Sequence, residues 1–330
     1  MLSPDELSRE AAATGFQSEV LEKALRLLEL LETIRSHPFL KGRIALKGGT
    51  ALNLFVLKLP RLSVDIDLNY IGAVDRETML SERPKVDQAV EAVCGRLGIQ
   101  VRRAPSEHAG GKWRLTYTNV WGRPGTLELD INFLLRTPLW PPITADSHPV
   151  GPSRAKGVRL LDIHELAAGK FAALLDRNAP RDLFDASRLL RDVQLDKARL
   201  RVALAVYGGT SRRDWRSISV DDIRADSRDV AQQLLPMLRR DLIPKRTDVK
   251  LWSENIASEC RARLSDIVPL RGREMEFLTA LNDRGEILPE LLTDDPQMQA
   301  IVRSHPGLLW KAQNVREFVA PRGPDPNGQE

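Results

Sequence analysis

The chain has 330 residues, with 49 Lys and Arg against 45 Asp and Glu, and its net charge of +4 permits a nucleic-acid partner without demanding one. With 42% hydrophobic and 28% charged residues it can bury a sizeable core, and its two distant cysteines, Cys94 and Cys260, argue against a disulfide framework or a structural zinc site. The sequence shows neither a signal-peptide pattern nor a stretch as long as a membrane span, so we expect a cytoplasmic protein with no membrane contact.

The first predicted element is an amphipathic helix over residues 20–36, where leucines recur at helical spacing. A short strand at 44–46, a glycine turn and a helical run at 51–58 follow it. The next segment, 62–70, alternates between apolar and polar residues with period two, which predicts a strand.

Pro84 fits the first turn of a helix that continues to Leu97. Residues 113–120 and 126–134 then read as two strands joined by a turn at 122–125. In the second strand apolar side chains share one face and polar side chains share the other. This alternation predicts a sheet with one buried face.

The stretch 138–153 is rich in Pro, Ser and Gly and predicts the main linker. It divides the chain into an N-terminal lobe, 1–150, with its core at about 40–135, and a mainly helical C-terminal lobe, 151–319. The last residues, 320–330, read as a disordered tail.

The acidic pair Asp65 and Asp67 is the sharpest chemical feature of the sequence. In a strand both side chains point to the same side, about 7 Å apart. Neighbouring carboxylates repel each other, and a cation between them relieves that repulsion. Asp130, on the polar face of another predicted strand, completes a set of three carboxylates that suits Mg²⁺ held jointly by protein and a triphosphate. The alternative interpretation is a solvated strand face.

The segment Lys47-Gly48-Gly49-Thr50 lies between a predicted strand and a predicted helix. Glycines there allow close backbone approach, and free N–H groups at a helix start attract a phosphate. The segment is not a Walker A loop, because no GxxxxGK[ST] occurs in the chain. Its position shortly before Asp65 predicts a phosphate cradle beside the carboxylates.

Lys170 lies in the middle of the apolar face of a helix that begins after Asp162. A lysine there either extends along its stem to solvent or reaches into a cleft towards an anion. The sequence leaves both interpretations open.

A second helix is predicted to begin at Pro180, with Asp182 and Asp185 one turn apart. Asp182 is in place to cap that helix and to pair with Arg181 or Arg177. Asp185 is beyond capping reach, which makes it the better candidate for a functional carboxylate.

A locally basic region extends from Arg188 to Arg216. It either meets a phosphate backbone or forms a salt-bridged face with the interleaved Asp192, Asp196 and Asp214. Its basic residues are Arg188, Arg191, Lys197, Arg199, Arg201, Arg212, Arg213 and Arg216.

Four segments in order carry a family resemblance over about residues 40–192: LKGGTALNL, RLSVDIDLNY, ELDINF and HELAAGKFAALLDRNAPRDLFDASRLL. They resemble the AbiEii/AbiGii-type nucleotidyltransferase toxins, including the MenT branch, of bacterial toxin–antitoxin and abortive-infection systems. The resemblance implies an α+β fold of the DNA polymerase β-like nucleotidyltransferase class, with a mixed sheet flanked by helices and a helical C-terminal lobe that closes a cleft.

The resemblance also implies roles for individual residues. Asp65 and Asp67 hold Mg²⁺ on an NTP, Lys170 neutralises triphosphate charge, and Asp185 orients the acceptor or serves as base, with Asp182 as a rival assignment. The expected nucleotide-binding residues are Lys47, Gly48, Gly49, Thr50, Arg61, Ser63 and Arg177, and Arg181 is a further candidate.

The function implied is nucleotidyl transfer from NTP to an RNA acceptor, the 3′ end of tRNA, which releases pyrophosphate and blocks translation and growth. A cognate antitoxin encoded alongside is also implied, and it need not bind the toxin directly. The alternatives are transfer to a protein or small-molecule hydroxyl, and a non-catalytic nucleotide-binding module. The repelling carboxylates argue against the module, because a scaffold has little reason to hold them together.

Overall fold

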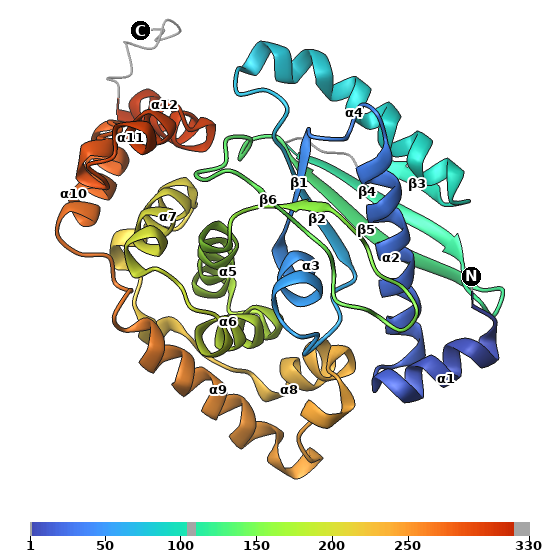
Figure 1. The fold of residues 1–330 in the computed structure, drawn as a ribbon. Coiled ribbons are helices and arrows are strands. Elements are labelled where there is room, and N and C mark those ends of the chain that lie inside the picture. Colours follow the sequence, from blue (N-terminus) through green and yellow to red (C-terminus); the bar gives the residue numbers. More distant parts are fainter. Residues whose placement is uncertain (1, 104–109, 320–330) are drawn as a thin grey trace, which may run out of the picture.

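A computed structural model describes residues 2–103 and 110–319, so the predicted tail at 320–330 lies outside the described residues. The described residues form a seven-stranded sheet in the order β3–β4–β5–β2–β1–β7–β6, with helices packed beside it (Figure 1). β2 pairs antiparallel with β1 and parallel with β5, so the sheet is mixed. The predicted α+β class is confirmed.

The strands match the predicted ones with ends shifted by a few residues, and β3, β6 and β7 are additional. Their bounds are β1 Ile44–Lys47, β2 Asp65–Tyr70, β3 Gln100–Arg103, β4 Gly110–Thr118, β5 Pro124–Asn132, β6 Ile143–Ala145 and β7 Val158–Leu160.

The stretch predicted as a linker, 138–153, contains β6. β6 pairs antiparallel with β7, and β7 pairs parallel with β1. One sheet therefore continues across the predicted boundary. The prolines of this stretch flank a short strand at the edge of the sheet, where a missing N–H donor is tolerated.

Three longer helices precede β6, and most of the chain after β7 is helical (Figure 1). The helices are α1 Pro4–Thr14, α2 Ser18–Ser36, α3 Gly48–Ala51, α4 Arg76–Arg96, α5 Ile163–Arg177, α6 Pro180–Asp192, α7 Lys197–Thr210, α8 Ser227–Asp229, α9 Val249–Leu264, α10 Arg273–Thr279, α11 Pro296–Arg303 and α12 Pro306–Val319. A π-helical turn at Leu52–Val56 extends α3.

The prediction that a helix begins at Pro84 is wrong, because α4 begins eight residues earlier, at Arg76. The carboxylate of Asp75 accepts a hydrogen bond from the N–H of Thr78 and caps that end. Pro84 lies inside the helix on an exposed position, so the hydrogen bond that it cannot make faces solvent.

The sheet has one face covered by α2 and α4. Arg26 of α2 lies over the ring of Tyr117, and Asp87 of α4 pairs with Arg103. Leu129 and Ile131 on the same side of β5 are fully buried. The opposite face carries the polar side chains of β2 and β5, and on this face α3 packs against β2 and α5 packs against α3. Strand alternation therefore puts the acidic pair on the side where the later helices stand.

Within the described residues, no helix is both long and apolar enough to cross a membrane. Cys94 and Cys260 are buried free thiols.

Candidate active site

A pocket of about 170 Å³ lies between β2 and the connection from α5 to α6. Segments that are far apart in the sequence meet there. One wall comes from Gly49, Arg61, Ser63, Asp65 and Asp67, and the other from Lys170, Arg177, Ala179, Arg181 and Asp182. The structure thus brings most of the residues expected at the site into one small, strongly polar pocket.

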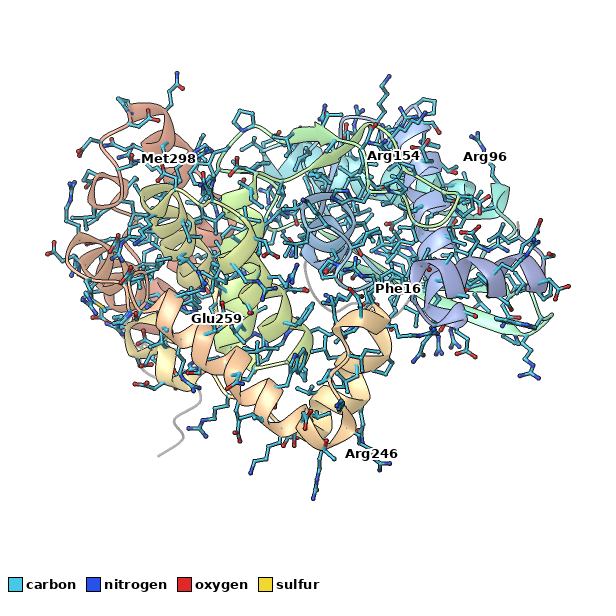
Figure 2. The ribbon with its side chains drawn as sticks, turned by 60° about the horizontal axis from the view of Figure 1, so that its bottom comes forward. Phe16, Arg96, Arg154, Arg246, Glu259 and Met298 are labelled. Carbon is cyan, nitrogen blue, oxygen red and sulfur yellow. The ribbon has the colours of Figure 1, made fainter. Side chains whose placement is uncertain are left out.

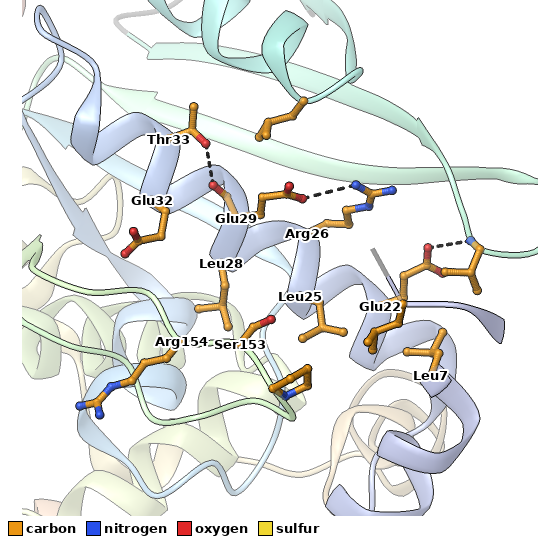
Figure 3. A pocket seen from close by; sticks show the side chains of 14 residues that line it. Leu7, Glu22, Leu25, Arg26, Leu28, Glu29, Glu32, Thr33, Ser153 and Arg154 are labelled. Carbon is orange, nitrogen blue, oxygen red and sulfur yellow. Dashed lines mark hydrogen bonds and ion pairs between the residues drawn. The ribbon is translucent and has the colours of Figure 1, made fainter. Parts of the chain in front are cut away.

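A larger hollow, about 610 Å³, lies beside α1 and α2 (Figure 3). Its polar side chains are already engaged: Glu22 accepts a hydrogen bond from the N–H of Val120, and Arg26 pairs with Glu29. Leucines such as Leu7, Leu25 and Leu28 make up much of its lining. Because size alone does not supply chemistry, we place the candidate site at the smaller pocket.

Asp65 and Asp67 stand on the same side of β2 and both line the pocket. NH1 of Arg181 lies 3.1 Å from Oδ2 of Asp65, whose side chain is 41% exposed. Asp67 has Lys47 opposite it on β1 and Asp130 opposite it on β5. Each carboxylate therefore has one cation beside it, Arg181 at Asp65 and Lys47 at Asp67. Asp67 has a second carboxylate on its other side, and both members of the pair remain open to the pocket.

Asp130 does not join the acidic pair in the pocket. Within the described ranges, no group of three or more His, Cys, Asp or Glu side chains is placed to hold a metal ion, so the predicted three-carboxylate set is not found. Burial raises the pKa of Asp130, and the neighbouring charge of Lys47 opposes that shift. Asp65 and Asp67 alone still fit Mg²⁺, which commonly takes one or two protein carboxylates and completes its shell with water and phosphate oxygens.

The glycine turn lies directly against the acidic pair. Gly48 has φ of 71°, in the left-handed region, and a Cβ atom there would overlap the carboxylate of Asp67. A Cβ atom at Gly49 would lie 2.9 Å from both the Arg61 guanidinium and Oγ of Ser63. Only glycine therefore allows the backbone to approach both sides of the pocket so closely.

Thr50 and Lys47 lie outside the pocket lining. Thr50 is fully buried, and its hydroxyl donates a hydrogen bond to the backbone carbonyl of Asp65. This contact fixes the first residue of β2 rather than presenting a hydroxyl to a ligand. Ser63, in contrast, does line the pocket.

Lys170 does not extend to solvent but reaches into the pocket wall. Its Nζ atom lies 2.8 Å from Oδ1 of Asp182 and 3.0 Å from Oδ2 of Asp185. Burial lowers the pKa of Lys170, but the two carboxylates outweigh it, so the net shift is upward and the ammonium stays charged. Of the two interpretations of this lysine, the cleft-facing one is confirmed.

Asp182 lines the pocket and joins two of the cations of its wall, Lys170 and Arg177. Its Oδ2 atom accepts a hydrogen bond of 2.7 Å from Nε of Arg177, so the predicted pairing is confirmed. The predicted capping is wrong, because no side chain caps the start of α6. Burial raises the pKa of Asp182, but the charges of Lys170 and Arg177 outweigh it and lower the pKa overall.

Asp185 lies behind the pocket wall and has no exposed surface. Nε and NH2 of Arg61 donate to its two oxygens over 2.7 and 2.6 Å, and the side-chain amide of Asn53 donates to Oδ1 over 3.0 Å. Burial opposes ionisation, but Arg61 and Lys170 outweigh it and hold the pKa of Asp185 well below its usual range.

Asn53 was missed by the sequence reasoning. Its amide donates to the backbone carbonyl of Gly49 as well as to Asp185, so it connects the glycine turn to the ion pairs behind the pocket. The available signal was a single amide inside the apolar run ALNLFVL.

The basic region from the end of α6 to Arg216 is largely a salt-bridged face, the second of its two interpretations. The pairs are Arg188–Asp192, Arg191–Asp192, Lys197–Asp266, Arg199–Asp162, Arg201–Glu274, Arg213–Asp222, Arg216–Asp214 and Arg216–Asp283.

Comparison with known proteins agrees with this fold. The family model for the nucleotidyl transferase AbiEii toxin of type IV toxin–antitoxin systems matches residues 29–257, which include every residue of the pocket. The chain belongs to this family of nucleotidyltransferase toxins. A search of curated protein sequences finds no match.

Among solved structures, the chain is similar to the nucleotidyltransferase toxin MenT4 from Mycobacterium tuberculosis H37Rv, with a TM-score of 0.57 and 17% sequence identity. The match covers 94% of this chain and 99% of MenT4. The helical region after the family match therefore also has a counterpart in a toxin of known structure.

Proposed function

We propose that this toxin is an Mg²⁺-dependent enzyme that transfers a nucleotide from an NTP to the 3′ end of tRNA in the cytoplasm. The observation that carries the proposal is one pocket with two carboxylates on a strand facing Lys170, Arg177 and Arg181 on the opposite wall. A triphosphate matches the cationic wall, and the Mg²⁺ that accompanies it matches the two carboxylates. Family membership adds the class of reaction.

In this proposal the cationic wall binds the triphosphate. Lys170 presents a buried, charged ammonium, and Arg177 and Arg181 are more exposed, with side-chain accessibilities of 65% and 39%. Gly49 and Ser63 close the other side of the pocket, and Gly48 lies outside its lining. Asp65 and Asp67 would hold Mg²⁺, which when bound supplies charge neutralisation and orientation of the phosphates.

The reaction forms one bond and breaks one. An oxygen of the acceptor hydroxyl attacks the α-phosphorus of the NTP, the bond from that phosphorus to the β-phosphate bridging oxygen breaks, and pyrophosphate leaves. The acceptor proton passes to solvent. The pocket is open to solvent at Arg177 and Arg181, whose side chains are partly exposed. Lys170 stabilises negative charge that develops on the departing phosphates.

We assign Asp185 a positioning role in place of the acceptor-orienting or basic role expected from the sequence. Both of its oxygens are occupied, and the direction of its pKa shift makes it a poor proton acceptor. Asp185 instead fixes the positions of Arg61 and Lys170, which lie on the two walls of the pocket. Asp182 has the same supporting effect on Lys170 and Arg177.

Tests of the proposal use the purified chain with α-³²P-labelled NTPs and total tRNA. We expect label in RNA that depends on Mg²⁺ and is released by RNase but not by protease. Asp67→Asn and Lys170→Met should each lower transfer by about 10²-fold or more. Asp294→Asn makes the same kind of change on a side chain that is 91% exposed, and it should leave transfer intact.

The label distinguishes the proposed acceptor from the alternatives. Protease-sensitive label would identify a protein as the acceptor in place of tRNA. Label that partitions with small molecules would identify a small hydroxyl compound as the acceptor. Growth arrest on expression that persists in Asp67→Asn would favour a binding module. We further propose that a cognate antitoxin, as expected for this family, counteracts growth inhibition by this toxin. It need not bind the toxin directly.

A further inference from the structure

The polar face of the sheet does not end at the pocket. Directly opposite Asp65 on β5 stands Glu128, opposite Glu128 on β4 stands Arg114, and opposite Arg114 on β3 stands Arg102. Residues that face each other across neighbouring strands lie on the same side of the sheet. A row of side chains therefore runs from the acidic pair to the outer edge of the sheet.

Arg102 and Arg114 form a like-charge pair across two strands. Like charges directly opposite each other in an antiparallel pair repel and destabilise the pairing. Both side chains are exposed, and among the residues that the structure describes neither one makes an ion pair or a side-chain hydrogen bond. Glu128, opposite Arg114 on β5, forms its ion pair with Lys112 instead, so no carboxylate in the described part of the chain pairs with either arginine.

The neighbouring cations behave differently. Arg103, next to Arg102 in sequence, points to the other face, pairs with Asp87 and lies over the ring of Trp113. Lys112, two residues before Arg114, pairs with Glu128 at 2.8 Å. The described carboxylates nearby are thus taken by other cations, and the Arg102–Arg114 pair is left to face solvent.

We propose that the Arg102–Arg114 pair binds a backbone phosphate of the acceptor RNA and directs its 3′ end along the sheet to Asp65 and Asp67. One phosphate between two guanidinium groups relieves their repulsion and accepts hydrogen bonds from both. Strands in a sheet are about 4.8 Å apart, so Arg114 lies roughly 10 Å and Arg102 roughly 14 Å from Asp65 along the row. The inference rests on the proposed function for the identity of the RNA, but its evidence lies outside the nucleotide pocket.

A phosphodiester backbone fits this face better than a protein partner does. The side chains of the row are charged, and the next row, with Thr116 and Thr126 opposite each other, is polar. Of the large exposed apolar side chains, Trp121 lies in the turn between β4 and β5, and others, such as Leu309 and Trp310 on α12, lie on other elements. A surface with charge, hydrogen-bond donors and little apolar area suits a nucleic-acid backbone.

The test compares the full chain with Arg102→Gln/Arg114→Gln in RNA binding without NTP. We expect the affinity for a fluorescent tRNA transcript to fall by about 10-fold, and the slope of log K against log salt to become shallower by about 0.7 to 0.9, as for one lost phosphate contact. In the transfer reaction KM for tRNA should rise while kcat at saturation and affinity for a fluorescent NTP stay unchanged.

Two further variants make the result specific. Arg246→Gln/Arg271→Gln removes the same charge from two exposed arginines without ion pairs in the described chain, and Arg246 lies at an outer edge of the molecule (Figure 2). It should bind tRNA within about twofold of the unmodified chain, since exposed charges beyond a Debye length are screened. Arg102→Lys/Arg114→Lys keeps the charge and should retain most of the affinity.

The outcomes separate this inference from the proposed function. Arginine-dependent tRNA binding without nucleotide transfer would support the phosphate site and reject the reaction. Transfer to tRNA with equal tRNA affinity in Arg102→Gln/Arg114→Gln and in the control would support the reaction and overturn the phosphate site. A loss of NTP affinity in Arg102→Gln/Arg114→Gln would also overturn it, because the pair would then belong to the nucleotide pocket.

Discussion

Arg61 and Asp185 form a buried, two-armed ion pair between segments 124 residues apart, with guanidinium–carboxylate distances of 2.7 and 2.6 Å. Arg61 precedes β2, and Asp185 lies in α6. The side chains are 2% and 0% exposed. This pair joins the sheet to the helical part of the chain directly behind the pocket, so both walls depend on it.

Removal of one partner should strongly destabilise the fold. Asp185→Asn leaves the buried Arg61 guanidinium without its full counter-charge, and losses of about 3–5 kcal/mol are typical when one member of a buried pair is removed. Urea unfolding at neutral pH measures this loss. Asp192→Asn, in a surface pair with Arg188 on the same helix, should cost about 1 kcal/mol or less. Equal losses in the two variants would contradict the assigned role.

The contribution of Asp185 should depend on pH in a defined direction. A carboxyl group whose pKa is lower in the folded state stabilises the fold above its unfolded pKa, about 3.9 for Asp, and loses that effect as pH falls below it. The difference in unfolding free energy between the unmodified chain and Asp185→Asn should therefore be constant from about pH 7 to pH 5. It should shrink below about pH 4, and a difference that grows there would have the wrong sign.

Glu165 should show the opposite dependence. Burial raises the pKa of Glu165 to about 7, and the N–H groups of Leu139 and Trp140 oppose that shift only in part. Because the folded state keeps the proton longer than the unfolded state, stability should fall as pH rises from about 4.3 through 7. Glu165→Gln should lack this fall and be the more stable protein at pH 8, as measured by thermal unfolding. A pH profile that the substitution does not change would contradict this prediction.

Substitutions at Thr50 and Ser63 should distinguish a residue that supports the pocket from one that contacts the nucleotide. Thr50→Val removes a buried hydroxyl that holds β2, and loss of such a bond costs about 1–3 kcal/mol of stability. Its effect on NTP affinity should be small. Ser63→Ala should leave stability nearly unchanged and weaken binding of a fluorescent NTP, because Ser63 lines the pocket. The reverse pattern would exchange the two roles.

Much of the pocket could be predicted from local patterns. The period-two alternation around Asp65 and Asp67 puts both carboxylates on one face of the strand. Lys170 lies in the middle of the apolar face of its helix, which indicates a buried cation. Both features depend only on backbone periodicity, which neighbouring residues specify.

The unpredicted parts depend on contacts between distant segments. Asp130 is opposite Asp67 in the sheet yet outside the pocket, whose second wall comes from α5, α6 and the connection between them. The burial of Asp185 requires Arg61 and Asn53, which lie more than a hundred residues away. β6 was read as linker since a three-residue edge strand has too little periodicity to stand out from its prolines.

Nucleotidyl transfer in the pocket between Asp67 and Lys170 can be followed by giving the enzyme the same NTP labelled either at the α- or at the γ-phosphate, together with tRNA. We expect that α-label enters RNA, that γ-label appears only in pyrophosphate, and that both products vanish in Asp67→Asn but persist in Asp294→Asn. Transfer of γ-label to the acceptor, or undiminished α-label in Asp67→Asn, would contradict nucleotidyl transfer in this pocket.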